Sequence, residues 1–588
     1  MTGSGRRATH EVLNQVPLLA DYDVAADAAL IDGLRREGGG WAETELHELG
    51  ALAGAANTQE HARLANVHKP ALRTHDALGY RIDEVDFHPS WHVLLATAVS
   101  HGLHAAPWVS DRPGAHVARA AKFMVWTQAE AGHGCPISMT YASVPALREA
   151  SDLADRYLPL LASSVYDPGL RPPLAKAGLL AGMAMTEKQG GSDVRANTTT
   201  ATPTADGSHL LTGHKWFCSA PMSDLFLVLA QAPEGLTCFL LPRVLPDGSR
   251  NAMYIQRLKD KLGNTSNASS EVEYDQAVAW RVGEPGRGVR TIINMVSATR
   301  LDCVLASAAA IRQATVVAVN YARQRRSFGA ALIDHPAMTG VLADLALESE
   351  AATTLALRLA GAADRAARGD AAEAALLRVA LPAAKYWICK RTPLVTAEAL
   401  ECLGGNGFIE DYSVMPRLLR DAPLNSIWEG SGNVTALDVL RALARTPDAA
   451  DALLAEADAA TGHQQASAAA RLRAVLNQAT AAGPAAEREV RRLAGQITVT
   501  LQAALMARHA PAAVADAFVA TRLNPEGYSP AMPFGSLPSG LDLPAILARA
   551  YVAPADGKPA GGKPAAADSA TDSVSASSGK PESVVTGR

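Results

Sequence analysis

A change of hydrophobic pattern near residue 181 constrains the fold of this chain more than any other feature. Residues 11–180 place apolar side chains three and four positions apart, most clearly over 91–103 and 115–130, which is typical of core-facing helices. Short β-rich runs then replace this pattern, and the helical period returns from Val289. The sequence therefore predicts a mainly helical protein with a β domain in its middle.

The middle segment, residues 181–288, is predicted to form a barrel or a sandwich. Turn signals at Asp206-Gly207, Pro233-Glu234-Gly235 and Asp247-Gly248 separate its β-rich runs. Those runs cover residues 210–212, 225–230, 237–241 and 271–274.

Long helices are expected on the C-terminal side. Periodic apolar segments over 292–321, 337–358, 371–396 and 434–443 predict a helical bundle from residue 289 to 445, with apolar surface left for other subunits. A further helical block is expected from 446 to 550. The remaining residues, 551–588, are rich in Ala, Ser, Gly and Pro and are expected to be disordered.

Charge and cysteine content narrow the functional classes. The formal net charge of -5 is near balance for 588 residues, so no polyanion-binding field covers the whole molecule. The six cysteines have no paired short spacing and fit reduced thiols of a cytoplasmic protein better than disulfides or a zinc site. Residues 1–30 lack a secretory signal, and no apolar run predicts a membrane span. His88, His92, His101 and His104 have no carboxylate-rich partner set, so no metal site is expected.

One carboxylate in the C-terminal half has an unusual setting. Glu429 lies in the stretch 425–433, after Ile427 and Trp428 and before a polar, glycine-containing turn. The apolar neighbours would disfavour its charged form and raise its pKa, which suits a general base. The alternative is a carboxylate at the start of a helix that Ser431 or Asn433 caps, and the local sequence by itself favours that alternative.

A second informative stretch, residues 183–194, lies where helices give way to strands. Gly190 and Gly191 let the backbone approach a ligand closely, and the hydroxyls of Thr186 and Ser192 can hold a phosphate or the edge of a heterocycle. A plain turn is the alternative, and this stretch taken alone favours it.

Taken together, these stretches resemble signatures of the acyl-CoA dehydrogenase family. Residues 186–193, Thr-Glu-Lys-Gln-Gly-Gly-Ser-Asp, resemble its Thr-Glu-Pro-x-Ala-Gly-Ser-Asp, and 427–431 resemble its Tyr-Glu-Gly-Thr base motif. Residues 325–329 resemble its Arg-x-x-Phe-Gly and 403–408 its Gly-Gly-Asn-Gly loop. The resemblance implies an N-terminal helical domain (1–180), a middle β-barrel (181–288) and a C-terminal four-helix bundle (289–445). Such proteins are usually homotetramers with FAD at the joints between domains.

Within the family, the chain is most similar to the AidB-like branch, the adaptive-response proteins of DNA alkylation damage. Residues 185–194, with Lys188 in place of the usual Pro, carry this likeness together with 257–264, 388–391 and 425–433. The branch implies an extra C-terminal helical domain, here 446–550, and binding of double-stranded DNA.

The resemblance also implies a set of FAD contacts. Thr186 would hydrogen-bond the flavin ring edge, Gly191 and Ser192 would lie near the pyrophosphate, and Arg325 and Phe328 would reach the FAD of a neighbouring subunit. At two positions the chain departs from the family's usual residues, which leaves two of these FAD contacts open. Ser219 would supply the hydroxyl near the flavin N5, and Glu401 replaces the family's Gln before the Gly-Gly-Asn-Gly loop. The whole set is Met185, Thr186, Gly191, Ser192, Trp216, Phe217, Ser219, Arg325, Phe328, Gly404, Gly405, Ile427, Trp428, Gly430, Ser431 and Asn433.

The implied reaction is α,β-dehydrogenation of an acyl-CoA. Glu429 would remove the α-proton while the β-hydrogen leaves as hydride to the flavin. Some relatives carry the base just before an arginine of the bundle; here that position is Thr299, which cannot serve. Arg300 would meet the CoA phosphates or act as a structural ion-pair partner. Trp428 and Phe217 are large and predict a short or branched acyl group with low turnover.

The net charge of the C-terminal block does not by itself predict DNA binding. Between residues 442 and 550 there are nine Arg, no Lys and nine Asp plus Glu. A local cluster nevertheless suggests a phosphate-binding face, with a solvated face beside a subunit interface as the alternative. Its members are Arg471, Arg473, Arg488, Arg491, Arg492 and Arg508. The alternative functions are a metabolic acyl-CoA dehydrogenase without a DNA role and a structural flavin carrier.

Overall fold

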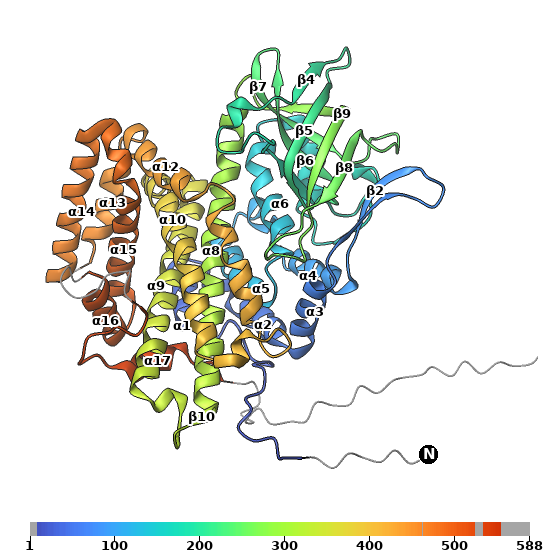
Figure 1. Cartoon of the computed structure of the whole chain (residues 1–588). Helices are drawn as coiled ribbons and strands as arrows, with labels where there is room; N and C mark the ends of the chain where they lie inside the picture. The colour runs from blue at the N-terminus through green and yellow to red at the C-terminus, as the bar shows by residue number, and fades with distance from the viewer. Residues whose placement is uncertain (1–8, 461, 524–532, 554–588) are drawn as a thin grey trace, which may run out of the picture.

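A computed structural model gives the fold, and it describes residues 9–460, 462–523 and 533–553 (Figure 1). The expected disorder of 551–588 therefore concerns residues that, from 554 onward, lie outside the described part. The N-terminal helices are α1 (Ala28–Arg36), α2 (Glu43–Gly54), α3 (Ala56–Val67), α4 (Pro89–Ser100), α5 (Ala115–Ala129), α6 (Gly134–Leu147) and α7 (Ser151–Leu161).

A β-hairpin, which the helical pattern of residues 11–180 does not predict, interrupts the helices of the N-terminal domain. Strand β1 (Ala71–His75) pairs antiparallel with β2 (Arg81–Asp86), and the hairpin projects from the molecule (Figure 1). Only one residue of the two strands, Asp83, is buried. Two mostly uncovered strands carry little hydrophobic pattern, which is why the sequence does not reveal them.

The middle domain is a closed β-barrel. Of the two predicted forms, barrel and sandwich, the structure has the barrel. Its strands are β3 (Ala181–Ala184), β4 (Thr200–Pro203), β5 (His209–Ser219), β6 (Leu225–Ala232), β7 (Gly235–Pro242), β8 (Met253–Leu258) and β9 (Ser269–Val282). The pairings β4–β5, β5–β9, β9–β7, β7–β6 and β6–β4 form a ring. Apolar side chains such as Phe226, Phe239 and Val272 fill its interior. Closing the ring pairs the edge strands that an open sheet would leave exposed.

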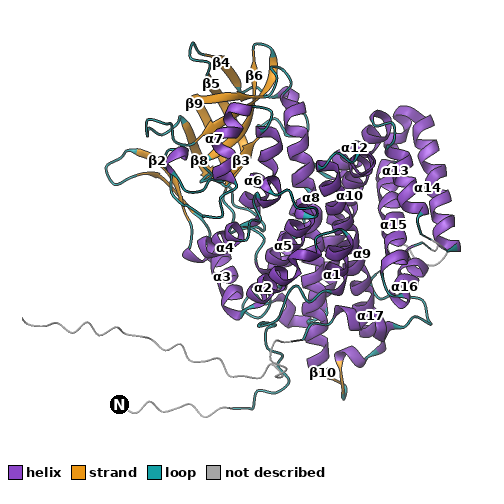
Figure 2. Ribbon diagram, turned by 180° about the vertical axis from the view of Figure 1, so that it is seen from behind, coloured by secondary structure: helices purple, strands orange, loops and turns teal. Residues whose placement is uncertain are grey.

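Four long helices form the predicted bundle: α8 (Gly288–Gln324), α9 (Pro336–Ala367), α10 (Ala371–Glu401) and α12 (Gly432–Arg445). The short helix α11 (Met415–Asp421) lies between α10 and α12. Helix α8 is long and apolar enough to cross a membrane by length and composition, but 83% of its most apolar window is buried inside the molecule. It therefore serves as a core helix of the bundle. Figure 2 shows the barrel strands at one end of these helices.

The C-terminal block consists of α13 (Ala449–Asp458), α14 (His463–Ala482), α15 (Val490–His509), α16 (Ala512–Arg522) and α17 (Leu543–Ala550). One apolar cluster runs without a break from the N-terminal helices through the bundle into this block. Partly buried ion pairs add to it, such as Arg358–Glu456 at 2.7 Å. The block is thus an extension of the bundle core, packed against α9 and α10.

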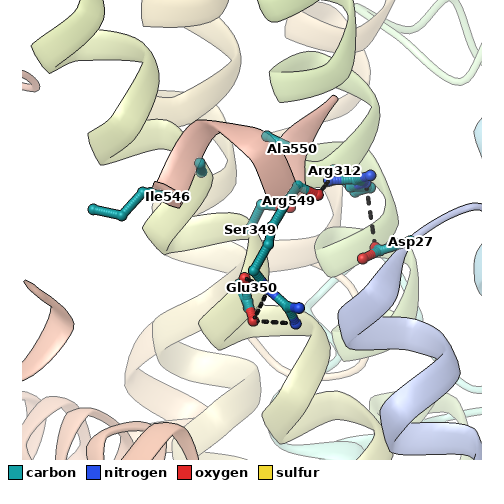
Figure 3. Close-up of a pocket in the computed structure, with 8 residues that line it drawn as sticks. Asp27, Arg312, Ser349, Glu350, Ile546, Arg549 and Ala550 are labelled. Carbon is teal, nitrogen blue, oxygen red and sulfur yellow. Dashed lines mark hydrogen bonds and ion pairs between the residues drawn. The ribbon is translucent and has the colours of Figure 1, made fainter. Parts of the chain in front are cut away.

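Helix α17 is tied back to the bundle by charged side chains. Arg549 pairs with Glu350 of α9 at 2.6 Å, and Arg312 of α8 lies 3.3 Å from Asp27, beside α1 (Figure 3). Figure 3 shows these groups, which line a small pocket together with Ser349, Ile546 and Ala550. The last described helix therefore bridges to elements from both halves of the chain.

Candidate active site

The 425–433 turn is held in an unusual backbone conformation. Glu429 has φ 56° and Gly430 has φ 106°, and a residue other than glycine rarely adopts positive φ without support. Lys385 of α10 donates hydrogen bonds to the carbonyl oxygens of Trp428 at 2.8 Å and Gly430 at 2.5 Å. Arg300 of α8 donates to the carbonyl of Glu429 at 2.9 Å. Two cations thus hold three successive carbonyls and fix where the glutamate points.

The carboxylate of Glu429 faces α8. Thr299 Oγ1 donates to its Oε2 at 2.6 Å. Burial raises the pKa of Glu429 above its ordinary value, while the hydrogen bond from Thr299 and the charges of Lys385 and Arg300 act in the opposite direction. A desolvated carboxylate with a raised pKa and a single side-chain donor is suited to accept a proton.

The helix-cap interpretation of this stretch is right for the position of Ser431 and wrong for Asn433. Helix α12 begins at Gly432 with Ser431 at its N-cap, and no side-chain hydrogen bond caps it. Asn433 lies inside the helix, and Glu429 points to Thr299 instead. The carboxylate is therefore available for chemistry.

Arg300 has the ion-pair role. Its Nη1 lies 2.5 Å from Asp438 of α12, and Arg378 of α10 bonds the same carboxylate at 2.9 Å. Only 9% of Arg300 is exposed. With Nη1 on Asp438 and Nε on the turn, the guanidinium is not arranged as an open fork for CoA phosphates, which was the other expectation.

The loop after β3 carries Met185, Thr186, Gly191 and Ser192. It is anchored by Glu187, whose carboxylate bonds Lys215 Nζ at 2.7 Å with both side chains fully buried. Burial by itself would raise the pKa of Glu187, but hydrogen bonds from Lys215, Thr198 and Thr199 hold it well below its ordinary value.

Glycine is required at position 191. A Cβ there would lie 2.3 Å from Thr186 Oγ1, so a side chain would force the two residues apart. The backbone N–H of Trp216 donates to the carbonyl of Thr186 at 2.8 Å, which joins the loop to β5. Ser192 is exposed and Thr186 is half-buried, so this loop presents polar groups beside the barrel.

The end of β5 meets the 425–433 turn. Trp428 packs against Cys135 and Met139 of α6 and Ala220 beyond β5. Phe217 and Ile427 are large apolar residues left 52% and 61% exposed. The hydroxyl of Ser219 lies 3.3 Å from Ser269 Oγ and also hydrogen-bonds the side chain of Cys135.

This junction fits a flavin. Stacking needs uncovered apolar surface, which Phe217 and Ile427 offer, and the ring edge needs hydroxyl and amide partners, which Thr186 and Ser219 offer. Trp216 differs from the expectation, because Lys259 Nζ covers its ring at 3.5 Å from the centroid.

Arg325, Phe328, Gly404 and Gly405 form a separate group at the far end of α8. A helix rise of about 1.5 Å per residue puts Gln324 roughly 37 Å from Thr299. Asn406 bonds Tyr321 near this end at 3.3 Å, and Phe328 is 98% exposed. These motif residues are therefore remote from Glu429 of the same chain.

Sequence reasoning missed Lys385, and it excluded Thr299 as a base without giving it another role. The sequence did contain a sign of Lys385: it is the one charged residue in the stretch 379–389, and lysine is almost never buried without a partner. Its partners are backbone carbonyls, which have no sequence signature.

The six arginines proposed for DNA do not form one continuous unpaired face. Arg473, Arg492 and Arg508 bond Asp458, Glu489 and Glu456, and Arg471 bonds the carbonyl of Leu523. Arg491 bonds the Tyr386 hydroxyl at 3.1 Å. Arg488 is exposed and precedes α15.

Comparison with known proteins shows the family to which the chain belongs. Three family descriptions match in order: the adaptive response protein AidB N-terminal domain over residues 14–168, the acyl-CoA dehydrogenase middle domain over 182–277 and the acyl-CoA dehydrogenase C-terminal domain over 286–444. Among solved structures, Caenorhabditis elegans ACDH-11 in complex with C11-CoA has a TM-score of 0.78 at 27% identity, covering 88% of this chain and 92% of that one.

Two relatives are similar along much of the chain. Acyl-CoA dehydrogenase family member 11 of Caenorhabditis elegans is 32% identical over 395 residues, 64% of this chain and 63% of that protein. AidB of Escherichia coli (strain K12), an acyl-CoA dehydrogenase by its name, is 50% identical over 453 residues, 76% of this chain and 83% of that protein. The chain therefore belongs to the FAD-dependent acyl-CoA dehydrogenase family, in its AidB-like branch.

Proposed function

We propose that Glu429 is the general base of an α,β-dehydrogenation of acyl-CoA. The observation that carries this is the carboxylate of Glu429: burial raises its pKa, Thr299 donates to it, and Lys385 and Arg300 fix the backbone that presents it. The backbone N–H of Glu429 has no hydrogen-bond partner among the described residues, so it can donate to the thioester carbonyl and acidify the α-carbon. Bound FAD supplies the hydride acceptor; the protein supplies the base and its orientation.

The substrate in this proposal is a short or branched acyl-CoA, turned over slowly. Trp428, next to the base, fills space between α6 and β5, which leaves little room for a long chain. The C. elegans structure was solved with C11-CoA, so a medium chain belongs in the test as well.

The test is anaerobic mixing of the FAD-loaded protein with butyryl-, isobutyryl- and octanoyl-CoA, with and without duplex DNA. Loss of the oxidised flavin absorbance with butyryl- or isobutyryl-CoA is the expected result. No bleaching with any thioester would favour the structural flavin carrier. Fast steady turnover in a second assay, with an added artificial electron acceptor to reoxidise the flavin, would favour a metabolic dehydrogenase.

Replacing Thr299 with valine should move the acid limb of the pH profile of kcat/KM to higher pH. Burial already raises the pKa of Glu429, and the Thr299 hydrogen bond favours the charged form. The base works only when deprotonated, so the rate falls as pH drops through this pKa, and removal of the donor raises the pKa further. Thr299→Ser keeps the donor and should leave the limb in place. If the acid limb of the pH profile stays in place in Thr299→Val, the Thr299 hydrogen bond does not control the pKa of Glu429.

The assembly in this proposal is a cytoplasmic homotetramer. Phe328, Phe408 and Ile409 are exposed apolar residues near the motif group at the far end of α8, and a second subunit would cover them. All six cysteines are buried and unpaired, in keeping with a reducing compartment. Sedimentation of Phe328→Ser should give a smaller species than the wild type if this surface is an interface.

Non-specific binding of duplex DNA, as part of an alkylation response, is the second candidate. Arg488, Arg491 and Arg492 support it, because they cluster at the start of α15. The affinity should fall linearly on logarithmic axes as salt rises, and Ala at all three positions should reduce the slope by about 0.9 for each phosphate that the variant no longer neutralises. Arg473→Ala is the control, since Arg473 lies on α14, outside the cluster at the start of α15. A DNA affinity that does not change with salt concentration would contradict this second candidate function.

A further inference from the structure

The indole of Trp428 is held by a chain of hydrogen bonds that runs into the bundle. Its Nε1–H donates to Asn425 Oδ1 at 2.9 Å, and Asn425 Nδ2 donates to Ser307 Oγ at 3.1 Å. Ser307 donates to Cys389 Sγ at 3.2 Å, and that thiol lies 3.6 Å from the carbonyl oxygen of Cys303. The chain connects the 425–433 turn to α8 and α10.

The donor and acceptor groups allow this series of hydrogen bonds to run in one direction only. An indole N–H can only donate, so it requires the oxygen of the Asn425 amide. The amide nitrogen then faces Ser307, which accepts from it and uses its own single hydrogen for Cys389. Ser307 and Cys389 are both 0% exposed, so water does not compete for these bonds. The Asn425 amide therefore has one orientation.

The other walls around the indole are more compliant. Trp428 packs on an apolar cluster whose flanks include Met139 and Met222. Methionine is unbranched and adapts its shape to a ligand. The indole is fixed instead at its backbone by Lys385 and at its ring by Asn425. If an acyl chain reaches the indole, its length limit thus depends on the indole more than on the neighbouring side chains.

We propose that Asn425 is a positioning residue that fixes Trp428 as the stop for the acyl chain and so sets the acyl length that the site accepts. The inference rests on the proposed acyl-CoA site. The substrate α-carbon has to lie within reach of the Glu429 carboxylate, and Trp428 is the adjacent residue. The acyl carbons beyond the α- and β-carbons therefore approach the indole of Trp428, and the orientation of the indole decides how many of these carbons fit.

The experiment compares Asn425→Leu with Asn425→Asp in the FAD-loaded full chain. Leucine removes the acceptor, and loss of one hydrogen bond should raise the ratio of kcat/KM for octanoyl-CoA over butyryl-CoA by about fivefold. Aspartate keeps an acceptor for the indole and should keep the wild-type ratio. A ratio unchanged by leucine, or changed equally by aspartate, would overturn the proposal.

Trp428→Phe provides a second, independent test. Phenylalanine keeps a ring but removes the N–H, so adding Asn425→Leu to it should change the ratio no further, whereas independent effects would multiply. Thermal protection of the protein by the same three thioesters is measured in parallel. If no thioester reduces the wild-type flavin, the proposed function fails, and the order of protection among chain lengths in wild type and Asn425→Leu still decides the role of Asn425.

Discussion

Replacing Glu429 with glutamine should slow flavin reduction by acyl-CoA roughly 10²- to 10⁴-fold, the usual range for loss of a general base. The amide keeps the volume of the side chain but cannot take up the α-proton. The turn should survive, because Lys385 and Arg300 hold its carbonyl oxygens and not the carboxylate. FAD content should therefore match the wild type while the rate of bleaching in stopped-flow collapses.

Glu398→Gln is a matched control for this substitution. Glu398 also lies in the bundle, on α10, and burial also raises its pKa, but it has no place in the 425–433 turn. Its variant should bleach at the wild-type rate. Equal loss in both variants would mean that buried carboxylates support the bundle in general and that Glu429 has no special chemical role.

Replacing Lys215 with methionine should lower the free energy of unfolding by about 3–5 kcal/mol, the cost of leaving a buried charge without its partner. Glu187 would lose its bond to Lys215 while remaining inside the barrel. The 185–194 loop depends on that carboxylate, so FAD should also dissociate more readily. Denaturant unfolding of the FAD-loaded and FAD-free protein measures both effects.

The pH dependence of this loss has a definite sign. The pKa of Glu187 is lowered in the folded protein, so the pair stabilises the fold above the ordinary glutamate pKa of 4.5 and loses that contribution as pH falls. The difference between wild type and Lys215→Met should thus be largest near neutral pH and shrink on acidification. Arg63→Met, which breaks the exposed pair with Glu60, should cost no more than about 1 kcal/mol.

The sequence predicts the barrel and the bundle well, because both have strong periodic patterns. The strands β5, β6, β7 and β9 contain the β-rich runs, and the helices α8, α9, α10 and α12 contain the predicted helical segments. The hairpin β1–β2 is different: it packs little apolar surface, so it has no pattern to detect. Elements that bury little apolar surface are therefore the ones that the sequence does not predict.

The sequence singles out Glu429 as a candidate base but does not show which groups support it. Glu429 is identified by its neighbours and by its place in a known motif. The clamp on its backbone by Lys385 uses carbonyl acceptors, which every residue has, so the sequence contains no sign of the pairing. The role of Arg300 was open for the same reason: its partner Asp438 lies on a different helix and only folding brings the two together.

The most direct test of the central claim is anaerobic reduction of the FAD-loaded protein by butyryl-CoA and by its α-deuterated form, measured in the wild type and in Glu429→Gln. The account predicts bleaching in the wild type that is slower with the α-deuterated thioester, and almost none in the variant. Bleaching of Glu429→Gln at the wild-type rate would contradict it.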